Sequence, residues 1–402
     1  MTVTISKSKA VGKVYAPPSK SVAHRALICA ALSTGSTVKN IAFSKDIKAT
    51  LESLKALGAN VEIDGTDVKI GGLCINNLKN ETPLPCNESG STLRFLMPLC
   101  MCCENEITLQ GTEKLFTRPL SVYSEICEKK NIYYKQESTS VTIGGVLKSG
   151  EYYVRGDISS QFITGLLYAL PILSGDSKII VTGNFESESY VDITLSVLSQ
   201  FGIEILKNDN VFYIKGNQKY KSTEITVEGD CSNAAFLDAF NLLGGEVEVL
   251  GLNSQTLQGD RVYKDMFCAL KNGEKQFDLS DCPDLAPVMF ALSAHFGGAH
   301  FVGTKRLKIK ESDRGAAMAE ELKKFGAEVI IGENEIEIKG GTLHSPKDIL
   351  CGHNDHRVVM ALSLLCSIYG GTISGAEAVS KSYPDFFETI QSLMIGIEQN
   401  DI

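Results

Sequence analysis

The sequence contains no long run of basic residues and no long run of apolar residues, and each absence excludes a class of protein. Its formal net charge is −9, so a surface for nucleic acid or for an anionic membrane is not expected. The longest apolar stretch, residues 165–173, is too short to span a bilayer. We therefore predict no nucleic-acid partner and no membrane association. Any anion-binding site in this acidic chain must be built locally from a few cations.

The cysteines and histidines do not follow the spacing of a metal site. The chain has 12 cysteines and 6 histidines, and among the histidines only His353 and His356 are close in sequence. Cys100, Cys102 and Cys103 lie in an apolar run, where cysteine usually acts as a small hydrophobic residue. We therefore predict no metal and no disulfide framework, and we expect a reducing compartment. The N-terminal residues lack the features of a secretory or transit leader, so the cytoplasm is the expected location.

The sequence does contain internal repeats in a chain long enough for two cores. With 402 residues it exceeds one ordinary hydrophobic core, so two domains are expected. One repeated unit is predicted to be a helix closed by glycine or asparagine, then a strand, a turn and a second strand. The four copies close their helices at Gly58, Asn131, Gly202 and Gly326 and, fourteen positions later, their hairpins at Gly72, Gly145, Gly216 and Gly340.

A second kind of helix alternates with these units and is apolar on nearly all sides, which predicts that it is buried. A fifth hairpin, within residues 263–280, is mostly lost. Six βαβαββ-like units predict an α/β fold of two pseudo-threefold domains with three units each. The six buried helices are expected to begin at Ser19, Gly90, Ser159, Cys231, Asp284 and Asp355.

The order of the repeats predicts where the domains divide. The short strand at residues 3–6 has no unit of its own, and it can complete the last unit of the chain. The two ends of the chain would then share a domain. We expect a terminal domain of residues 1–15 and 225–402 and an inserted domain of residues 16–224, with the active site in the cleft between them.

Cations stand beside several of these helix starts. A helix N-terminus carries about half a positive charge, and it binds phosphates and carboxylates readily. Serine and aspartate at such positions are usually simple caps. A cap does not explain the neighbouring cations, because a cation there costs roughly 0.3–1 kcal/mol unless an anion is bound. The cations, which are Lys20, Arg25, Arg94, Arg118 and Arg357, therefore favour a site for substrates with several negative charges.

Five short motifs carry a resemblance to a known family. Each is weakly specific alone, but their occurrence in one order along nearly the whole chain is highly specific. On these motifs the chain resembles the 5-enolpyruvylshikimate-3-phosphate synthases, which belong to the enolpyruvyl transferases. The motifs are KSVAHRA at residues 20–26, ESGSTLR at 88–94, KESDR at 310–314, NDHR at 354–357 and SKSYPD at 380–385.

The resemblance implies an inside-out α/β barrel of two domains and a reaction of the shikimate pathway, which leads to chorismate and the aromatic amino acids. The 5-hydroxyl of shikimate 3-phosphate adds to C2 of phosphoenolpyruvate while C3 takes a proton, and the intermediate then loses phosphate and a proton from C3. The implied shikimate 3-phosphate ligands are Lys20, Ser21, Arg25, Ser159, Ser160, Gln161, Ser187, Tyr190, Asp284 and Lys310. The implied phosphoenolpyruvate ligands are Lys20, Gly90, Arg118, Gln161, Arg314, His356, Arg357 and Lys381.

By the same resemblance, Asp284, Glu311 and Lys20 are the catalytic residues, with Asp284 near the hydroxyl and Glu311 near C3. This chemistry needs an acid and base at C3 and many cations, and no metal or other cofactor. The substrates are the only expected partners. A monomer is expected, since one chain carries the whole site.

Several of these residues also have a purely structural interpretation. Lys310 and Glu311 could form a solvated face before a helix, and His356 could be a hydrogen-bonded core histidine. Asp284 is expected to cap a helix over residues 285–296 in addition to its catalytic role. Tyr190 could be ordinary packing, and Arg94 is expected to brace other residues and not to touch a ligand.

Two positions depart from the family pattern. Glu88 stands where many members have asparagine, and Arg306 stands where some members place an asparagine that contacts shikimate.

The main alternative is UDP-N-acetylglucosamine enolpyruvyl transferase, which shares the fold but uses a loop cysteine. The corresponding loop, residues 110–118, has no cysteine. Two hypotheses complete the interpretation: shikimate 3-phosphate closes the domains, and glyphosate occupies the phosphoenolpyruvate site beside Gly90.

Overall fold

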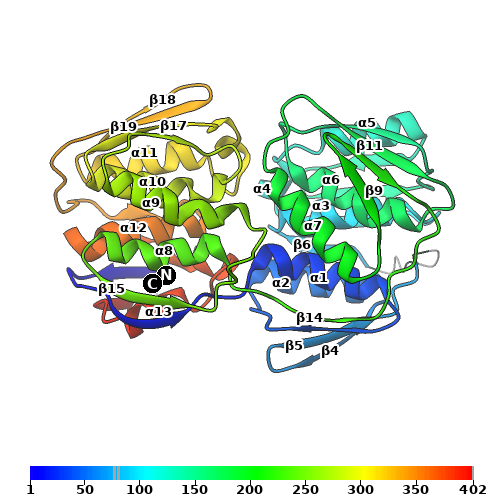
Figure 1. Cartoon of the computed structure of the whole chain (residues 1–402), viewed down its shortest axis with the longest axis horizontal. Coiled ribbons are helices and arrows are strands. Elements are labelled where there is room, and N and C mark those ends of the chain that lie inside the picture. Colours follow the sequence, from blue (N-terminus) through cyan, green and yellow to red (C-terminus); the bar gives the residue numbers. More distant parts are fainter. Residues whose placement is uncertain (76–77, 79–81, 401–402) are drawn as a thin grey trace. The chain divides into compact units, whose positions relative to one another are not determined.

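A computed structural model describes residues 1–75, 78 and 82–400 of the chain, which forms two compact units (Figure 1). Unit 1 combines Met1–Pro17 with Gly229–Ile402, and unit 2 is Pro18–Glu228. Within the described residues, no helix combines the length and the apolar character needed to cross a membrane.

Unit 2 contains three four-stranded sheets of one common design. In each, an edge strand pairs parallel with a second strand, which is followed by an antiparallel hairpin. The side chains alternate between buried and exposed along these strands, as expected for sheets with one face toward a core. The sheets are β14 (Glu224–Thr226), β3 (Ser36–Lys39), β5 (Asp67–Gly71) and β4 (Asn60–Asp64); β6 (Leu84–Asn87), β7 (Ile107–Gly111), β9 (Ser140–Gly144) and β8 (Tyr133–Gln136); and β10 (Glu151–Arg155), β11 (Ser177–Thr182), β13 (Val211–Ile214) and β12 (Ile205–Asn208).

The buried helices of unit 2 are those whose sequences are apolar on nearly all sides. Each is capped by a serine whose hydroxyl accepts a backbone bond, and Figure 1 shows two of them, α3 and α6, in contact side by side. They are α1 (Lys20–Leu32), α3 (Gly90–Cys100) and α6 (Ser160–Ala169), and the remaining helices are α2 (Lys45–Ala56), α4 (Glu113–Phe116), α5 (Ser121–Lys130), η2 (Leu170–Ile172) and α7 (Glu188–Gln200).

Unit 1 repeats this design with two changes. Strand β1, from the start of the chain, lies between β21 and β22 and pairs antiparallel with both, so the prediction that it completes the last unit is confirmed. The fifth hairpin is missing among the described residues, as predicted, and β15 pairs only with β2. The sheets are β20 (Leu350–Cys351), β21 (Gly371–Ser374), β1 (Thr2–Ile5) and β22 (Ile397–Asn400); β16 (Gln276–Asp278), β17 (Gly298–Val302), β19 (Glu335–Lys339) and β18 (Glu328–Ile331); and β15 (Glu246–Leu250) with β2 (Val11–Tyr15).

The helices of unit 1 also divide into a buried and an outer set. The buried set packs together, since α10 contacts both α8 and α12. The buried helices are α8 (Cys231–Leu242), α10 (Ala286–His295) and α12 (His356–Tyr369). The others are α9 (Tyr263–Lys271), α11 (Arg314–Lys324) and α13 (Phe386–Ser392), with 3-10 turns η3 (Gly259–Val262), η4 (Pro283–Leu285), η5 (Lys305–Ile309) and η6 (Ala376–Lys381).

The predicted helix ends are confirmed by the backbone. Asn131 caps α5 in the left-handed conformation with a φ of 54°, and Gly58, Gly202 and Gly326 follow their helices with positive φ.

The chain passes between units slightly later than the sequence suggested. Strand β14 pairs with β3, so unit 2 extends to Glu228 and not to residue 224.

Candidate active site

The first helix of unit 2 begins with a lysine that is held by an aspartate. Lys20 Nζ lies 2.8 Å from Asp46 Oδ2, at the start of α2. Both side chains are mostly buried, with 16% and 14% of their surfaces exposed. Sequence reasoning missed Asp46, although Ser44, which caps α2, marks a helix start beside it. The pair fixes the ammonium group in one place.

Arg25 is buried one turn further along α1. Its guanidinium donates to Thr194 Oγ1 at 2.8 Å, to the Ser21 carbonyl at 2.6 Å and to the Tyr190 carbonyl at 2.9 Å. All three acceptors are uncharged, and burial lowers the pKa of Arg25. A buried cation with only neutral partners favours the binding of an anion. The structure thus brings Ser21, Arg25 and Tyr190 together from α1 and α7.

A second group lies at the starts of α3 and α6. Arg94 donates to Gln161 Oε1 at 2.7 Å and to the Pro119 carbonyl at 3.0 Å, and Gln161 donates to Ser91 Oγ at 3.0 Å. Burial, together with the charge of Arg118, lowers the pKa of Arg94 to about 9. Arg94 therefore braces Gln161, as predicted.

Gly90 allows Arg118 to approach the start of α3 closely. A Cβ atom at position 90 would lie 3.0 Å from Arg118 Nη1 and 3.7 Å from Gln161 Oε1. Arg118 Nε is buried and has no hydrogen-bond partner among the described residues. The glycine, the arginine and the glutamine thus lie close together, and the arginine has donors suited to a carboxylate or phosphate.

The predicted serines stand at two further helix starts of unit 2. Ser159 caps α6, and its hydroxyl accepts a bond from Gln161 N at 3.3 Å, while Ser160 is the first residue of that helix. Ser187 precedes α7 in the left-handed conformation, with a φ of 55°. Thr164 and Thr194, with hydroxyls 2.9 Å apart, join α6 to α7, so these starts are held in fixed positions.

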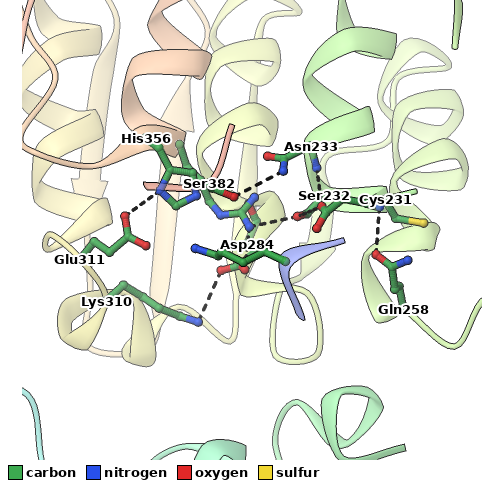
Figure 2. A network of polar contacts seen from close by, with 12 residues as sticks. Cys231, Ser232, Asn233, Gln258, Asp284, Lys310, Glu311, His356 and Ser382 are labelled. Atoms are coloured by element: carbon green, nitrogen blue, oxygen red, sulfur yellow. Dashed lines mark hydrogen bonds and ion pairs between the residues drawn. The ribbon is translucent and has the colours of Figure 1, made fainter. Parts of the chain in front are cut away.

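In unit 1 the central feature is the Asp284 carboxylate, which is surrounded by cations (Figure 2). Its Oδ1 accepts from Arg314 Nη1 at 2.8 Å and lies 3.4 Å from Lys310 Nζ. Its Oδ2 accepts from Arg357 Nη2 at 2.8 Å. Three elements supply these cations: Lys310 follows η5, Arg314 begins α11 and Arg357 lies at the start of α12.

The cluster changes the proton affinity of its members. Burial alone raises the pKa of Asp284, but Arg357, Lys310 and Arg314 outweigh it and hold that pKa well below its ordinary value. Burial lowers the pKa of Lys310 to about 8, although Asp284 acts in the opposite direction. Asp284 is therefore ionised in this arrangement, and Lys310 can lose its proton near pH 8.

Glu311 and His356 form a second acid–base pair next to this cluster. His356 Nδ1 lies 2.7 Å from Glu311 Oε2, and the imidazole is almost fully buried (Figure 2). Asp355 accepts from Arg314 Nε at 2.9 Å and from Ser312 Oγ at 3.0 Å, and its other oxygen accepts from Arg357 N as the cap of α12. The carboxyl group of Glu311 is thus oriented by a histidine whose helix is itself fixed.

Further polar residues orient the cations of unit 1. Arg357 Nη2 donates to Ser232 Oγ at 3.0 Å, and Asn233 Nδ2 lies 3.4 Å from Ser382 Oγ. Lys381 Nζ donates to the Asn354 carbonyl at 2.6 Å. Ser232 and Asn233 were not predicted, and the only sequence signal for them is the helix start at Cys231. The cluster contains four cations, Lys310, Arg314, Arg357 and Lys381, and three carboxylates, Asp284, Glu311 and Asp355.

Two structural interpretations of the sequence are wrong. Asp284 does not cap the helix, because it lies inside η4 and the residue at the cap position of α10 is Leu285. Its carboxylate is drawn instead toward the cations of α11 and α12. Lys310 and Glu311 are not a solvated face, since Lys310 and Asp284 form an ion pair and Glu311 contacts His356. Arg306 is also buried, with 6% of its surface exposed.

Two groups of side chains in the described part of the chain have the ligand types of a metal site. They are Glu311, Asp355 and His356, and Glu320, Glu321 and His353. In each group a cationic side chain already occupies the carboxylate: Arg314 binds Asp355, and Lys324 binds Glu321. A bound metal ion would have to displace that cation.

Comparison with known proteins gives one consistent family. A family model described as EPSP synthase (3-phosphoshikimate 1-carboxyvinyltransferase) matches residues 5–390. A Clostridium kluyveri protein named 3-phosphoshikimate 1-carboxyvinyltransferase is 46% identical over 421 residues, covering 97% of each chain. A Clostridium novyi protein of the same name is 40% identical over 430 residues, again covering 97% of each.

Solved structures agree on the fold. The structure of an EPSP synthase from Acinetobacter baumannii has a TM-score of 0.78 to this chain and is 23% identical in sequence. It covers 99% of this chain and 100% of its own. At that identity the similarity supports the fold alone, which is the predicted α/β architecture of repeated units with buried helices.

Proposed function

This chain belongs to the EPSP synthase family, and on that premise we propose that it transfers the enolpyruvyl group of phosphoenolpyruvate to shikimate 3-phosphate. The products are 5-enolpyruvylshikimate 3-phosphate and phosphate, within the shikimate pathway. One observation carries the proposal for this chain itself: two carboxyl groups suited to proton transfer, Asp284 and Glu311, lie in one cluster with Lys310, Arg314 and Arg357.

Unit 2 is proposed to hold shikimate 3-phosphate. Within the described residues, Arg25 donates to neutral acceptors alone, and the serines stand at helix starts, where backbone N–H groups and the helix dipole favour a phosphate. We assign the substrate phosphate to Ser159, Ser160 and Ser187. The ring and its hydroxyls are assigned to Lys20, Ser21, Arg25, Gln161 and Tyr190 in unit 2 and to Asp284 and Lys310 in unit 1.

Phosphoenolpyruvate is proposed to bind cations of both units. Arginine binds carboxylate and phosphate groups through two parallel hydrogen bonds, which suits a small substrate with both groups. Gly90, Arg118 and Gln161 would contribute from unit 2, and Lys20 would contact both substrates. Arg314, His356, Arg357 and Lys381 would contribute from unit 1.

The proton steps are assigned to the two carboxyl groups. Asp284 would accept the proton of the 5-hydroxyl as its oxygen adds to C2, and Glu311 would give a proton to C3. In the elimination step, Glu311 would remove a proton from C3 while the leaving phosphate takes up the proton that Asp284 accepted. Asp284 is a weak base while it is held by three cations. Substrate anions would draw Arg314 and Arg357 away from it, and its proton affinity would rise when the hydroxyl arrives.

The direct test is phosphate release from phosphoenolpyruvate with two alternative acceptors. We expect release with shikimate 3-phosphate and none with UDP-N-acetylglucosamine. Release only with the nucleotide sugar would move the chain to the sister enzyme, which lacks support here because residues 110–118 contain no cysteine. A monomer is proposed as the working form, since a single chain supplies every assigned residue. The cytoplasm is proposed as its location.

A further inference from the structure

A buried ion network lies on helix α11 outside the groups assigned to substrate. Glu321 is fully buried, and its Oε1 lies 2.9 Å from His353 Nε2 and accepts from Lys324 Nζ at 2.9 Å. Its Oε2 accepts from the backbone N–H of Cys351 at 2.9 Å. One carboxylate thus binds both the backbone and a side chain of the segment that leads into α12.

That segment has an unfavourable backbone conformation. Asp355 N donates to the Gly352 carbonyl at 2.9 Å, which closes a turn whose central residues are His353 and Asn354. Both have positive φ, 49° and 52°. Turns of this kind prefer glycine and asparagine, and a left-handed residue of another type persists only where its surroundings fix it. His353 needs such support, and Glu321 provides it.

The turn connects directly to groups assigned to the reaction. The carbonyl of its third residue, Asn354, accepts from Lys381 Nζ at 2.6 Å. Its fourth residue, Asp355, accepts from Arg314 Nε at 2.9 Å and caps the helix that begins with His356 and Arg357. A change in the turn would therefore move Lys381 and the start of α12 together.

We propose that Glu321 and His353 are positioning residues for the reaction. The pair holds the turn of residues 352–355 in the shape that places the Asn354 carbonyl against Lys381 and the Asp355 carboxylate against Arg314. This inference rests on the proposed function, because it needs Lys381 to bind phosphoenolpyruvate. Neither residue touches substrate in this assignment.

The charges around the pair give it a pH dependence. His353 faces Glu321, Glu320 at 3.9 Å and Lys324, and its backbone N–H donates to Cys351 Sγ. The hydrogen bond with Glu321 raises the pKa of His353 above its ordinary 6.5, against the effect of burial. Its contribution is complete below 6.5 and is lost as pH rises through the raised pKa. Affinity for phosphoenolpyruvate should weaken over the same range.

Four variants at positions 321 and 353 test the pair. Turnover of the unmodified protein tests the proposed function separately. Glu321→Gln cannot accept every bond of the carboxylate, so we expect KM for phosphoenolpyruvate to rise roughly ten- to hundredfold and KM for shikimate 3-phosphate to stay within about twofold. His353→Gln keeps a donor near the same place without titrating. It should retain activity and lose the fall in phosphoenolpyruvate affinity with rising pH. His353→Gly removes both the bond and the backbone strain, so it should impair binding less than His353→Ala.

A matched control uses another imidazole–carboxylate pair of unit 1. His300 Nε2 lies 3.1 Å from Glu335 Oε2 at the surface, and His300→Gln should change neither KM nor the pH profile. Equal increases in both KM values for Glu321→Gln would overturn the proposal, since they would indicate general damage. An unchanged KM for phosphoenolpyruvate in that variant, or a fall in phosphoenolpyruvate affinity with rising pH that His353→Gln retains, would overturn it as well.

A measurement on the unmodified protein covers the case in which these variants do not fold. Coupling between two sites is reciprocal, so phosphoenolpyruvate should raise the pKa of His353 if the charged pair favours its binding. Histidine Cε1–H resonances titrated with and without phosphoenolpyruvate would show this shift. A His353 pKa that does not move when phosphoenolpyruvate saturates an active enzyme would overturn the proposal while leaving the proposed function intact.

Discussion

Asp284→Asn tests the charge balance of the unit 1 cluster most directly. The substitution keeps the shape of the side chain and removes the negative charge that Arg314, Arg357 and Lys310 share. Removing one partner of a buried ion pair costs about 3–5 kcal/mol, because the other charge stays buried. The amide oxygen can still accept one bond, and Asp355 still binds Arg314, so we expect the lower end of this range.

This loss should be visible as a lower melting temperature. In a domain of 150–250 residues, 1 kcal/mol moves Tm by about 2–4 °C, so a loss of about 3 kcal/mol lowers Tm by roughly 6–12 °C. Circular dichroism in a buffer without multivalent anions would measure it. Glu333→Gln is a suitable control, because it removes a charge of the same sign from an exposed pair with Lys305 in the same unit, and its Tm should hardly change.

Inorganic phosphate should rescue the variant. With Asp284 neutral, the three cations bind an anion without competition from the carboxylate. Ligand at a hundred times its Kd stabilises the folded state by about 2.7 kcal/mol, which offsets most of the loss. The gain in Tm with phosphate should therefore be larger in the variant than in the unmodified protein, although turnover should fall by about 10²–10⁴.

Two results would refute this reasoning. An unchanged or higher Tm of Asp284→Asn without anions would mean that the carboxylate does not balance the cations. Equal gains in Tm with phosphate in both proteins would mean that Asp284 does not compete with anions for Arg314 and Arg357.

Three further predictions follow from single groups. Glu311→Gln should lower turnover by about 10²–10⁴, measured by phosphate release, without weakening the binding of either substrate, measured by calorimetry. Full activity of the variant would exclude Glu311 as the acid and base at C3. Gly90→Ala should displace Arg118, because the new Cβ lies 3.0 Å from its Nη1. The KM for phosphoenolpyruvate and the inhibition constant of glyphosate should therefore both rise. Equal inhibition of the variant and the unmodified protein would argue against a shared site. Lys310 has a pKa of about 8 and loses its positive charge as pH rises, so affinity for shikimate 3-phosphate should fall above that pH. Lys310→Arg should remove this fall in affinity.

The repeated architecture was predictable because it is written in local patterns. A glycine or asparagine that ends a helix, followed by two alternating strands, requires only neighbouring residues, and Asn131 and Gly202 show the expected positive φ. Strand β14 was harder to assign, because its three residues carry little pattern of their own. Its place follows from pairing with β3, which lies far from it in sequence. The domain boundary shifted for that reason.

The candidate site was predictable in position and not in its pairings. Helix starts with adjacent cations marked Lys20, Arg25 and Arg357 correctly as parts of polar groups. Asp46 lies on the next helix of the same repeat and Ser232 lies in another repeat, so no local pattern connects Lys20 to Asp46 or Arg357 to Ser232. The misplaced cap at Asp284 has the same origin. An aspartate after a proline favours a cap locally, and tertiary cations overrode that preference.

The partners of the cations differ between the units, and this difference predicts an order of binding. In unit 2, Lys20 binds Asp46, but Arg25 donates to uncharged acceptors, so shikimate 3-phosphate displaces no carboxylate from Arg25. In unit 1, Arg314 and Arg357 already bind Asp284, and phosphoenolpyruvate must compete with it. Shikimate 3-phosphate should therefore bind the free protein well. Phosphoenolpyruvate should bind weakly until the hydroxyl of that substrate gives Asp284 another partner.

Calorimetric titration of each substrate alone, and of each in the presence of the other, would measure this order. A dead-end analogue of shikimate 3-phosphate without the 5-hydroxyl prevents turnover in the mixed titration, and it also removes the group that engages Asp284. We therefore expect the analogue to bind and to enhance phosphoenolpyruvate binding only slightly, whereas Asp284→Asn should bind phosphoenolpyruvate alone more tightly than the unmodified protein does. Tight binding of phosphoenolpyruvate alone to the unmodified protein would contradict the argument, because it would show that Asp284 does not hold the cations against an incoming anion.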